Sequence, residues 1–372
     1  MKKLFYIANI RMPSERAHGI QVAHMCAAFA REGFSVTLLV PDRATIADDP
    51  YAYYRVARTF AIEKISVPDT VRFGLLGFLL EAIIFAYRAV RHVRKEQQTL
   101  VYTREELPML FLPANIPTFY EAHQMRRSFF FRRLIQRAQG VIAISQGLAD
   151  AFVARVGISR ERMLVAHDGY DAVQFSTHIS QSEARTRLRL PHNGRIAMYI
   201  GGFEPWKGAH ILCQAVPTLV LHNITVALIG GREEEIAVFK KRYPAALFLG
   251  PRPYRDLPLL QQSADVLVIP NSTRARISRE FTSPLKLFAH MASGVPIVAS
   301  DVPSLREVVS EKEVFLYAPD DSASLARTAL AVFANGTEAA ARARRALERA
   351  RDFTWEKRAA RVARFFSTRI SR

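Results

Sequence analysis

The sequence lacks the cysteine content of a disulfide-stabilised or metal-binding protein. Only two cysteines, Cys26 and Cys213, occur in 372 residues, and they lie far apart among apolar neighbours. They offer neither a disulfide framework nor the paired spacing of a metal site. We therefore expect two buried thiols in a reducing compartment, which indicates a cytoplasmic protein.

Long uncharged hydrophobic runs are also lacking. The longest apolar stretch, residues 73–90, is interrupted by Glu81 and Arg88, and a spanning helix needs roughly 18 to 20 mostly apolar residues. We expect no segment to cross a membrane. Glycine (17) and proline (19) are near their average frequencies, which excludes collagen-like and disordered chains.

Three motifs for metals or phosphates do not occur. The sequence has no Asp-x-Asp pair, no glycine-rich loop ending in Lys-Ser or Lys-Thr, and no His/Cys metal spacing. We therefore expect no metal and no cofactor. Any bound phosphate would have to be held by side chains and helix amino termini.

Acidic residues are scarce. The 34 Asp and Glu residues face 52 Lys and Arg, which gives a net charge of +18 spread over both halves of the chain. Such an excess favours nucleic acid, anionic lipid or phosphorylated ligands as partners. Because no nucleic-acid recognition module is visible, nucleic acid is not an expected partner.

Short strand patterns alternate with helical patterns and then start again. The first series covers residues 4–10, 36–40, 100–102, 118–120 and 140–144, and the second covers 195–200, 224–229, 246–249, 266–269 and 296–299. This alternation predicts parallel sheets covered by helices. We therefore predict an α/β protein of two tandem Rossmann-like, doubly wound domains that face a cleft, with ligands at the carboxyl ends of the strands.

Gly19 follows the first strand and precedes a helical pattern over residues 20–31. A glycine at this place lets a ligand approach the amino terminus of a helix, where free N–H groups favour an anion. The full dinucleotide fingerprint is absent, so an ordinary turn is the alternative.

In the second half, Gly201 and Gly202 follow a strand, and Lys207 stands five residues beyond Gly202. Lys207 could hold a phosphate as a point charge. The alternative is a solvated lysine at a helix start. Because a lysine there opposes the helix dipole, the sequence favours an anionic partner.

A third segment combines helix-start signals with basic residues. Ser283 is a good N-cap and Pro284 suits the first position of a helix over residues 285–293. The free amides, Lys286 and the arginines at 274, 276 and 279 would form a diphosphate cradle. A capped helix beside a solvated basic loop is the alternative.

Two features of the first half complete the candidate set. His123 follows a strand, where it could exchange a proton with a sugar or phosphate oxygen; a structural histidine is the alternative. Residues 126–137 interleave three phenylalanines with five arginines. Base stacking, docking on an anionic bilayer and a helix with buried aromatic side chains are all compatible with this pattern. The apolar stretch at 73–80 favours lipid, and the candidates for that contact are Arg126, Arg127, Phe129, Phe130 and Arg132.

With these segments located, the chain resembles the retaining, GT-B-fold glycosyltransferases of family 4 in their bacterial form, over nearly its whole length. The matching segments are PSERAHGIQVAHMCAAFAREGFSVTLLVP, GGFEPWKG, SPLKLFAHMASGVPIVASDVPSLREVV and FTWEKRAARV. Their order and spacing make the resemblance more specific than any one of them.

The resemblance implies that a sugar is transferred, with retention, from a nucleoside-diphosphate sugar to an acceptor hydroxyl, and the basic, aromatic-rich first half of the chain suggests a cell-envelope or lipid-linked glycan as that acceptor. It also implies an acceptor-side domain of residues 1–175, completed by a returning helix at 355–372, and a donor-side domain of residues 176–354. The reaction would occur in the cytoplasm, at the inner face of the plasma membrane.

By the same resemblance, His123 would face the transferred sugar and Gly19 would lie near the donor diphosphate. Lys207, together with amides at residues 283–285, would neutralise the leaving diphosphate without a metal. The family often pairs this lysine with an arginine; glycine stands there in GGFEPWKG, and Arg232 is a candidate substitute. Ala289 replaces a glutamate that in the family holds the donor ribose, so a non-catalytic sugar-nucleotide or glycan-binding protein is the alternative function.

Overall fold

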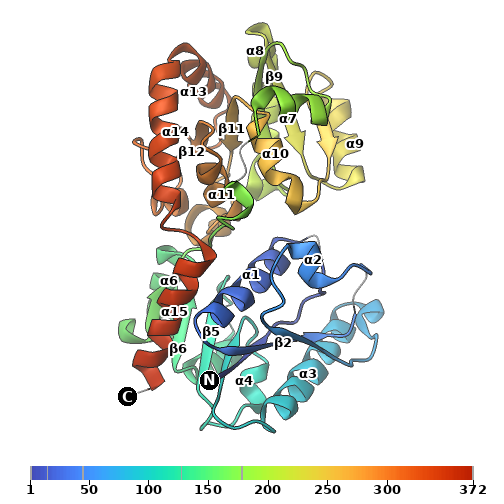
Figure 1. The fold of residues 1–372 in the computed structure, drawn as a ribbon, viewed down its shortest axis with the longest axis vertical. Coiled ribbons are helices and arrows are strands. Elements are labelled where there is room, and N and C mark those ends of the chain that lie inside the picture. Colours follow the sequence, from blue (N-terminus) through green and yellow to red (C-terminus); the bar gives the residue numbers. More distant parts are fainter. Residues whose placement is uncertain (1, 15, 44–45, 127, 177–178, 371–372) are drawn as a thin grey trace. The chain divides into compact units, whose positions relative to one another are not determined.

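The structure, a computed structural model, describes residues 2–14, 16–43, 46–126, 128–176 and 179–370. It divides into two compact units, each built on one parallel sheet (Figure 1). Unit 1 comprises Met1–His167 with Trp355–Arg372, and unit 2 comprises Asp168–Thr354. The two Rossmann-like parallel-sheet domains expected from the sequence are confirmed. The division falls at residue 168, whereas the sequence placed it after residue 175.

Unit 1 contains a seven-stranded parallel sheet in the order β3-β2-β1-β4-β5-β6-β7. Its strands are β1 (Lys3–Ile7), β2 (Ser35–Pro41), β3 (Ala61–Ile65), β4 (Thr99–Thr103), β5 (Thr118–Ala122), β6 (Gly140–Ala143) and β7 (Met163–Val165). Its α-helices are α1 (Ala17–Arg31), α2 (Pro50–Tyr54), α3 (Gly74–Val93), α4 (Pro108–Phe111), α5 (Phe129–Gln136), α6 (Gln146–Val156) and α15 (Trp355–Ile370), with short helices η1 (Val71–Phe73) and η2 (Arg160–Arg162).

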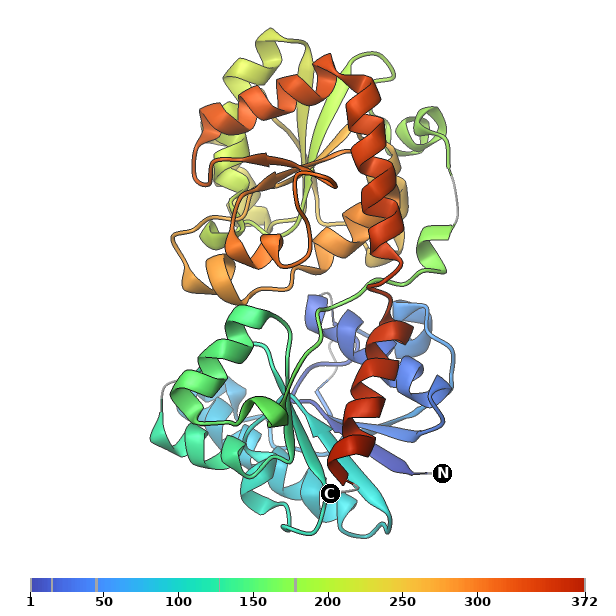
Figure 2. The ribbon, with the colours of Figure 1, turned by 90° about the vertical axis from the view of Figure 1, so that its left-hand side faces the viewer.

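Successive side chains of the central strands point to opposite faces of the sheet and pack against different helices. Phe5 of β1 packs with Phe85 of α3, whereas Tyr6 contacts Tyr102 of β4, which in turn contacts Phe366 of α15 with ring centroids 5.5 Å apart. Helices α1 and α15 lie side by side on that second face (Figure 1, Figure 2). Because both faces are covered, these strands are apolar throughout rather than alternating.

Unit 2 contains a six-stranded parallel sheet in the order β10-β9-β8-β11-β12-β13. Its strands are β8 (Arg195–Ile200), β9 (Ile224–Ile229), β10 (Leu247–Gly250), β11 (Val266–Ile269), β12 (Ile297–Ser300) and β13 (Phe315–Tyr317). Its α-helices are α7 (Gln181–Leu188), α8 (Ala209–Leu221), α9 (Glu233–Arg242), α10 (Leu257–Gln262), α11 (Leu285–Ser293), α12 (Pro303–Arg306), α13 (Ser322–Ala334) and α14 (Gly336–Ala350). Short helices η3 (Gln174–Ser176), η4 (Pro205–Lys207), η5 (Tyr254–Asp256) and η6 (Ile277–Phe281, a π-helix) occupy its connections.

Three strands, β3, β7 and β13, were not predicted from the sequence. All three lie at an outer edge of their sheet. β7 and β13 are only three residues long, and β3 carries Glu63 and Lys64. Edge strands are half exposed, so they lack the continuous apolar run that marks a central parallel strand.

Helix α3 meets a condition that we expected no segment of the chain to meet. Together with η1 it has the length and the hydropathy of a membrane span, Glu81 and Arg88 included. It is the one such helix among the described residues. Its carboxyl-terminal half nevertheless belongs to the core of unit 1, because Phe85, Val90 and Val93 pack against the sheet.

Candidate functional site

Glu121 is the centre of a buried polar network at the carboxyl edge of the unit 1 sheet. Its fully buried carboxylate accepts hydrogen bonds from Tyr6 Oη (2.6 Å), Gln21 Nε2 (2.6 Å) and Arg358 Nη2 (2.5 Å). Burial alone would raise the pKa of Glu121, but Arg358, His123 and nearby cationic groups hold it well below its usual range. The network therefore contains an ionised carboxylate at neutral pH, with three hydrogen-bond donors around it.

His123 lies beside this carboxylate, two residues beyond it. Its Nε2 is 3.5 Å from Glu121 Oε1 and 3.3 Å from Gln21 Nε2. Burial lowers the pKa of His123 to about 4, and Arg104 adds to the effect while Glu121 opposes it. The imidazole is thus neutral at pH 7. Its orientation is set through Nε2, and Nδ1 is the ring nitrogen suited to a ligand.

Positive charge gathers around His123. Burial lowers the pKa of His18 to about 4, and Arg104, Arg16 and His123 contribute to the decrease. Arg104 follows β4 and donates a hydrogen bond to the Gln21 side chain. The carboxyl edge of unit 1 therefore presents cationic groups beside two neutral histidines, a combination suited to an anionic ligand.

These two histidines predict a pH dependence for the stability of unit 1. In the unfolded chain a histidine binds its proton near pH 6.5, whereas folded His18 and His123 do so near pH 4. The unfolded state therefore binds more protons in this window, and the free energy of unfolding falls as the pH drops from 6.5 to 4. The expected slope is about 1.4 kcal/mol per pH unit for each histidine.

The slope can be measured by urea denaturation at several pH values in a Trp206→Phe background, in which Trp355 fluorescence reports unit 1. A His18→Asn/His123→Asn variant should have a clearly shallower slope. His222→Asn, at an exposed position after α8, is the control and should leave the slope unchanged. An unchanged slope in the double variant would show that these histidines do not exclude protons in the folded state.

Gly19 does not lie where the sequence placed it. α1 begins at Ala17 rather than at residue 20, so Gly19 is in the first helical turn and its N–H donates to Arg16 O at 3.0 Å. A Cβ at this position would lie 2.2 Å from Tyr54 Oη. Tyr54 itself bonds the backbone of Ser14. Packing of this tyrosine explains the glycine, and contact of Gly19 with a donor diphosphate stays a prediction.

The aromatic and basic segment at α5 is divided between core and surface. Phe131 is buried, whereas Phe129 and Phe130 are exposed. Arg126 pairs with the carboxylate of Glu106, and Arg132 is exposed. Arg127 lies outside the described residues. Two of the three aromatic side chains are therefore available to a partner.

In unit 2, the turn after β8 brings an ammonium group to the carboxyl edge of the sheet. Lys207 ends the short helix η4, and its Nζ lies 3.0 Å from the carboxylate of Glu204. A Cβ on Gly202 would lie 2.3 Å from Glu204 Oε2 and 3.0 Å from Lys207 Nζ. Glycine at 202 therefore leaves room for this ion pair.

Lys286 brings a second amino group close to this turn, 3.6 Å from where a Cβ on Gly201 would lie. Its Nζ is buried, lies 4.7 Å from the Tyr199 ring centroid, and has no hydrogen-bond partner among the described residues. Burial lowers the pKa of Lys286 to about 7; Lys207 adds to the decrease and Glu204 opposes it. Glu204 therefore pairs with Lys207, whereas Lys286 has no partner of opposite charge in contact, and a bound anion would supply the missing negative charge.

The start of α11 differs from the predicted cap. The helix begins at Leu285, and Pro284 rather than Ser283 occupies the N-cap position, with no capping side chain. Ser283 Oγ instead accepts a hydrogen bond from the Asp168 backbone N–H at 2.9 Å, so the predicted N-cap role of Ser283 is wrong. Without a capping side chain, the first-turn amides are available to an anion.

Two of the loop arginines form ion pairs with a neighbouring glutamate. Arg276 Nε lies 2.5 Å and Arg279 Nη2 lies 2.8 Å from the Glu280 carboxylate, and their part in a diphosphate cradle stays a prediction. Arg232 is the N-cap residue of α9, is exposed, and pairs with Glu235 at 3.0 Å. It follows β9, the neighbour of β8, at the same edge of the sheet as Gly202.

Several residues of these sites were missed from the sequence: Gln21, Arg104, Glu204 and Arg358. Glu204 and Arg358 stand inside the segments GGFEPWKG and FTWEKRAARV, so position alone could have suggested them. Their roles, however, depend on tertiary contacts, such as the pairing of Arg358 with a carboxylate 237 residues earlier.

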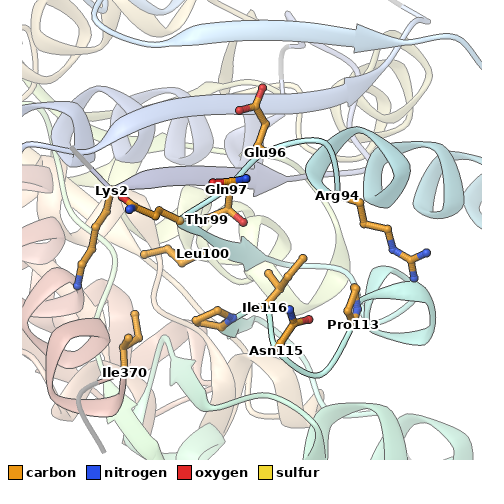
Figure 3. A pocket seen from close by; sticks show the side chains of 12 residues that line it. Lys2, Arg94, Glu96, Gln97, Thr99, Leu100, Pro113, Asn115, Ile116 and Ile370 are labelled. Carbon is orange, nitrogen blue, oxygen red and sulfur yellow. The ribbon is translucent and has the colours of Figure 1, made fainter.

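A pocket in unit 1 lies away from this chemistry (Figure 3). It is lined by Lys2, Thr99, Pro117 and Ile370, among others, at the amino ends of β1, β4 and β5. Because ligands of parallel sheets bind at the carboxyl ends, we do not assign it to the site. Among the described residues, no three His, Cys, Asp or Glu side chains come together as a metal site.

Comparison with known proteins relates both units to one enzyme class. The family model "Glycosyltransferase Family 4" matches residues 19–174, and "Glycosyl transferases group 1" matches residues 194–335. The chain is 27% identical to a D-inositol 3-phosphate glycosyltransferase of Corynebacterium glutamicum, over 57% of this chain and 53% of the relative. It is also 27% identical to a phosphatidyl-myo-inositol mannosyltransferase of Mycobacterium leprae, over 59% of this chain and 60% of that protein. It thus spans little more than half the length of these relatives.

Among solved structures, the Anabaena protein HepE in complex with UDP has a TM-score of 0.77 at 19% identity, over 99% of this chain and 100% of HepE. HepE has also been solved with UDP and glucose and with UDP-glucose. At this level of identity the likeness establishes a shared fold.

Proposed function

From the premise that the chain belongs to the family 4 glycosyltransferases of the GT-B fold, we propose that it is a retaining enzyme that uses a nucleoside-diphosphate sugar. The observation that carries the proposal is that two lysines, Lys207 and Lys286, lie at the carboxyl edge of the unit 2 sheet, and that the buried Nζ of Lys286 has no hydrogen-bond partner among the described residues. The likeness to HepE, which was solved with UDP and with UDP-glucose, supports a nucleotide sugar as the donor.

The proposed chemistry is stabilisation of a leaving diphosphate. As the bond to the anomeric carbon breaks, negative charge grows on the diphosphate oxygens. Lys207, Lys286 and the first-turn amides of α11 meet that charge most strongly in the transition state. Arg232 would bind the outer phosphate oxygens after leaving Glu235. In this proposal the charge is neutralised without a metal ion.

On the acceptor side, His123 is proposed to face the transferred sugar. Because its imidazole is neutral at pH 7 and held through Nε2, it would act as a hydrogen-bond partner of a sugar hydroxyl through Nδ1. Gly19 is proposed to lie near the donor diphosphate.

The proposed acceptor is a cell-envelope or lipid-linked glycan, used at the cytoplasmic face of the membrane. The basic groups around His18, including Arg104 and Arg16, suit an acceptor that carries a phosphate. The relatives named above act on inositol phosphate and phosphatidylinositol, which agrees with this charge.

A thermal-shift series with nucleoside diphosphates and their sugars tests the donor proposal. A ligand present at about 100 times its Kd adds about 2.7 kcal/mol to the free energy of unfolding. For a unit of this size we expect a rise in Tm of about 5 to 10 °C with the correct nucleotide. Transfer with retention should then appear as an unchanged anomeric configuration in the product, measured by NMR.

The second candidate function, non-catalytic binding of a sugar nucleotide or glycan, rests on Ala289. This residue is buried in α11 where the family has its ribose-binding glutamate. A nucleotide that raises Tm without turnover of any donor would favour the binder. If no nucleoside diphosphate raises Tm and no donor is consumed, sugar transfer and binding of a sugar nucleotide are both rejected.

A further inference from the structure

We propose that the amino-terminal half of α3 inserts into the interface of an anionic bilayer and holds unit 1 on it. This inference deepens the proposed use of a lipid-linked acceptor, but its test does not require transfer. The inserting element, called here the α3 apolar surface, consists of Val71, Phe73, Leu75, Leu76, Phe78, Leu79, Leu80 and Ile83.

The α3 apolar surface is unusually exposed. Leu75 is 82% and Leu76 is 79% exposed, and most of the exposed large apolar side chains in the described part of the chain lie between residues 71 and 87. Soluble monomers rarely expose a contiguous patch of this kind without a binding partner.

The exposure has a geometric cause. α3 has 20 residues and is therefore about 30 Å long, whereas the five-residue strands β3 and β4 that it connects are about 17 Å long. Phe85, Val90 and Val93, in the carboxyl-terminal half of the helix, pack against the sheet. The first turns of the helix consequently extend past the edge of the sheet and have no core to cover.

This overhanging end is held in place without a membrane. Thr70 Oγ1 donates to Gly77 O at 2.7 Å, and a Cβ on Gly77 would lie 1.8 Å from Thr70 O, so η1 packs tightly on the helix start. Arg43 pairs with Glu81 at 3.0 Å and donates to Asn9 Oδ1 at 2.7 Å. The surface is therefore pre-formed, which reduces the entropy lost when it docks.

The α3 apolar surface lies at the same edge of the sheet as the acceptor-side residues. Helices that follow parallel strands start at the carboxyl edge, so α3 after β3 and α5 after β5 begin at one edge. Phe129 and Phe130, at the start of α5, add exposed aromatic rings there. A lipid-linked acceptor held by His123 would thus come from the membrane on which the protein rests.

The neighbouring charges favour anionic lipid as the partner. The Arg72 guanidinium lies 4.9 Å from the Phe73 ring centroid, and that of Arg133 lies 5.0 Å from the Phe129 ring centroid. Arg132 is exposed on α5, and the chain carries a net charge of +18. Apolar side chains flanked by arginines suit the boundary between acyl chains and anionic headgroups. A spanning position for α3 would remove Phe85 and Val90 from the core of unit 1, so we infer shallow insertion.

The test is sedimentation of the full chain with phosphatidylcholine vesicles that contain or lack phosphatidylglycerol. The variant Leu75→Ser/Leu76→Ser is expected to lose vesicle affinity by at least about 100-fold, because each leucine contributes most of its transfer free energy on insertion. The matched control is Leu221→Ser/Val238→Ser, which changes two apolar residues of unit 2 that are 84% and 64% exposed. It should bind like the wild type.

A second measurement reports insertion directly. In a Leu76→Trp variant, the emission of the new tryptophan should shift to the blue with anionic vesicles and be quenched by brominated acyl chains. The inference is overturned if the serine variant still pellets, if the control loses as much affinity, or if Leu76→Trp is not quenched. It is also overturned if the surface proves to pair two copies of the chain, shown by a dimer that the serine variant abolishes.

Experiments can reject membrane insertion and sugar transfer independently of each other. The serine variant should hydrolyse a nucleotide-sugar donor in solution at the wild-type rate. A wild-type protein that is quenched by lipid but consumes no donor would reject catalysis and keep the membrane surface.

Discussion

Lys207→Ala is expected to lower kcat for sugar transfer by about 100- to 1000-fold, the usual loss when one preorganised charge-stabilising group is removed. The reason is that the diphosphate carries more charge in the transition state than in the bound donor. Affinity for the intact nucleoside-diphosphate sugar, measured by calorimetry, should therefore fall much less than kcat. Lys207→Arg should recover part of the rate because it restores the charge but not the geometry.

Lys240→Ala is the matched control for this variant. Lys240 is an exposed lysine of α9 in the same unit, and its loss should leave kcat unchanged. Turnover near the wild-type value in Lys207→Ala would remove Lys207 from the mechanism. A loss of donor affinity with an unchanged kcat would show that Lys207 binds the ground state and the transition state alike.

Arg358→Met is expected to lower the free energy of unfolding of unit 1 by about 3 to 5 kcal/mol, the cost of leaving a buried charge without its partner. Arg358 is 3% exposed and donates to the fully buried Glu121 carboxylate, and also to His167 O at 2.9 Å. Methionine preserves much of the volume, so the loss reports charge rather than packing. Urea denaturation followed by Trp355 fluorescence in a Trp206→Phe background measures it.

Two further variants make this result specific. Arg361→Met removes an exposed arginine from the same helix, with one hydrogen bond to Val165 O, and should cost about 1 kcal/mol or less. The double variant Glu121→Gln/Arg358→Met should regain much of the lost stability, because it removes both charges. If Arg358→Met unfolds like the wild type, the Glu121 carboxylate does not depend on this cation.

The arrangement of strands and helices was largely predictable, because both faces of each sheet are covered and the central strands are therefore continuous apolar runs. The pattern does not mark β7 or β13, which are short edge strands with few neighbours. Lys207 and Lys286 were predictable as candidates because both stand at the carboxyl edge of a predicted sheet, where ligands of such folds bind.

Features that depend on distant partners were not predictable. Ser283 is a residue type that commonly caps helices, but its hydroxyl accepts a hydrogen bond from the backbone N–H of Asp168, 115 residues earlier. The exposure of α3 follows from comparing its length with that of the strands beside it, which requires the assembled sheet.

The position of Arg358 in the chain has a consequence for synthesis on the ribosome. Unit 1 is interrupted by the whole of unit 2, so the cation that neutralises Glu121 is translated after Asp168–Thr354. At about 5 to 20 residues per second, this interval is on the order of 10 to 40 seconds. During that time Phe29, Tyr102 and Phe119 lack the Phe366 ring that covers them in the finished molecule. We therefore expect the nascent amino-terminal segment to expose apolar surface that chaperones bind. Unit 2 is continuous in the chain and can fold before unit 1 is complete.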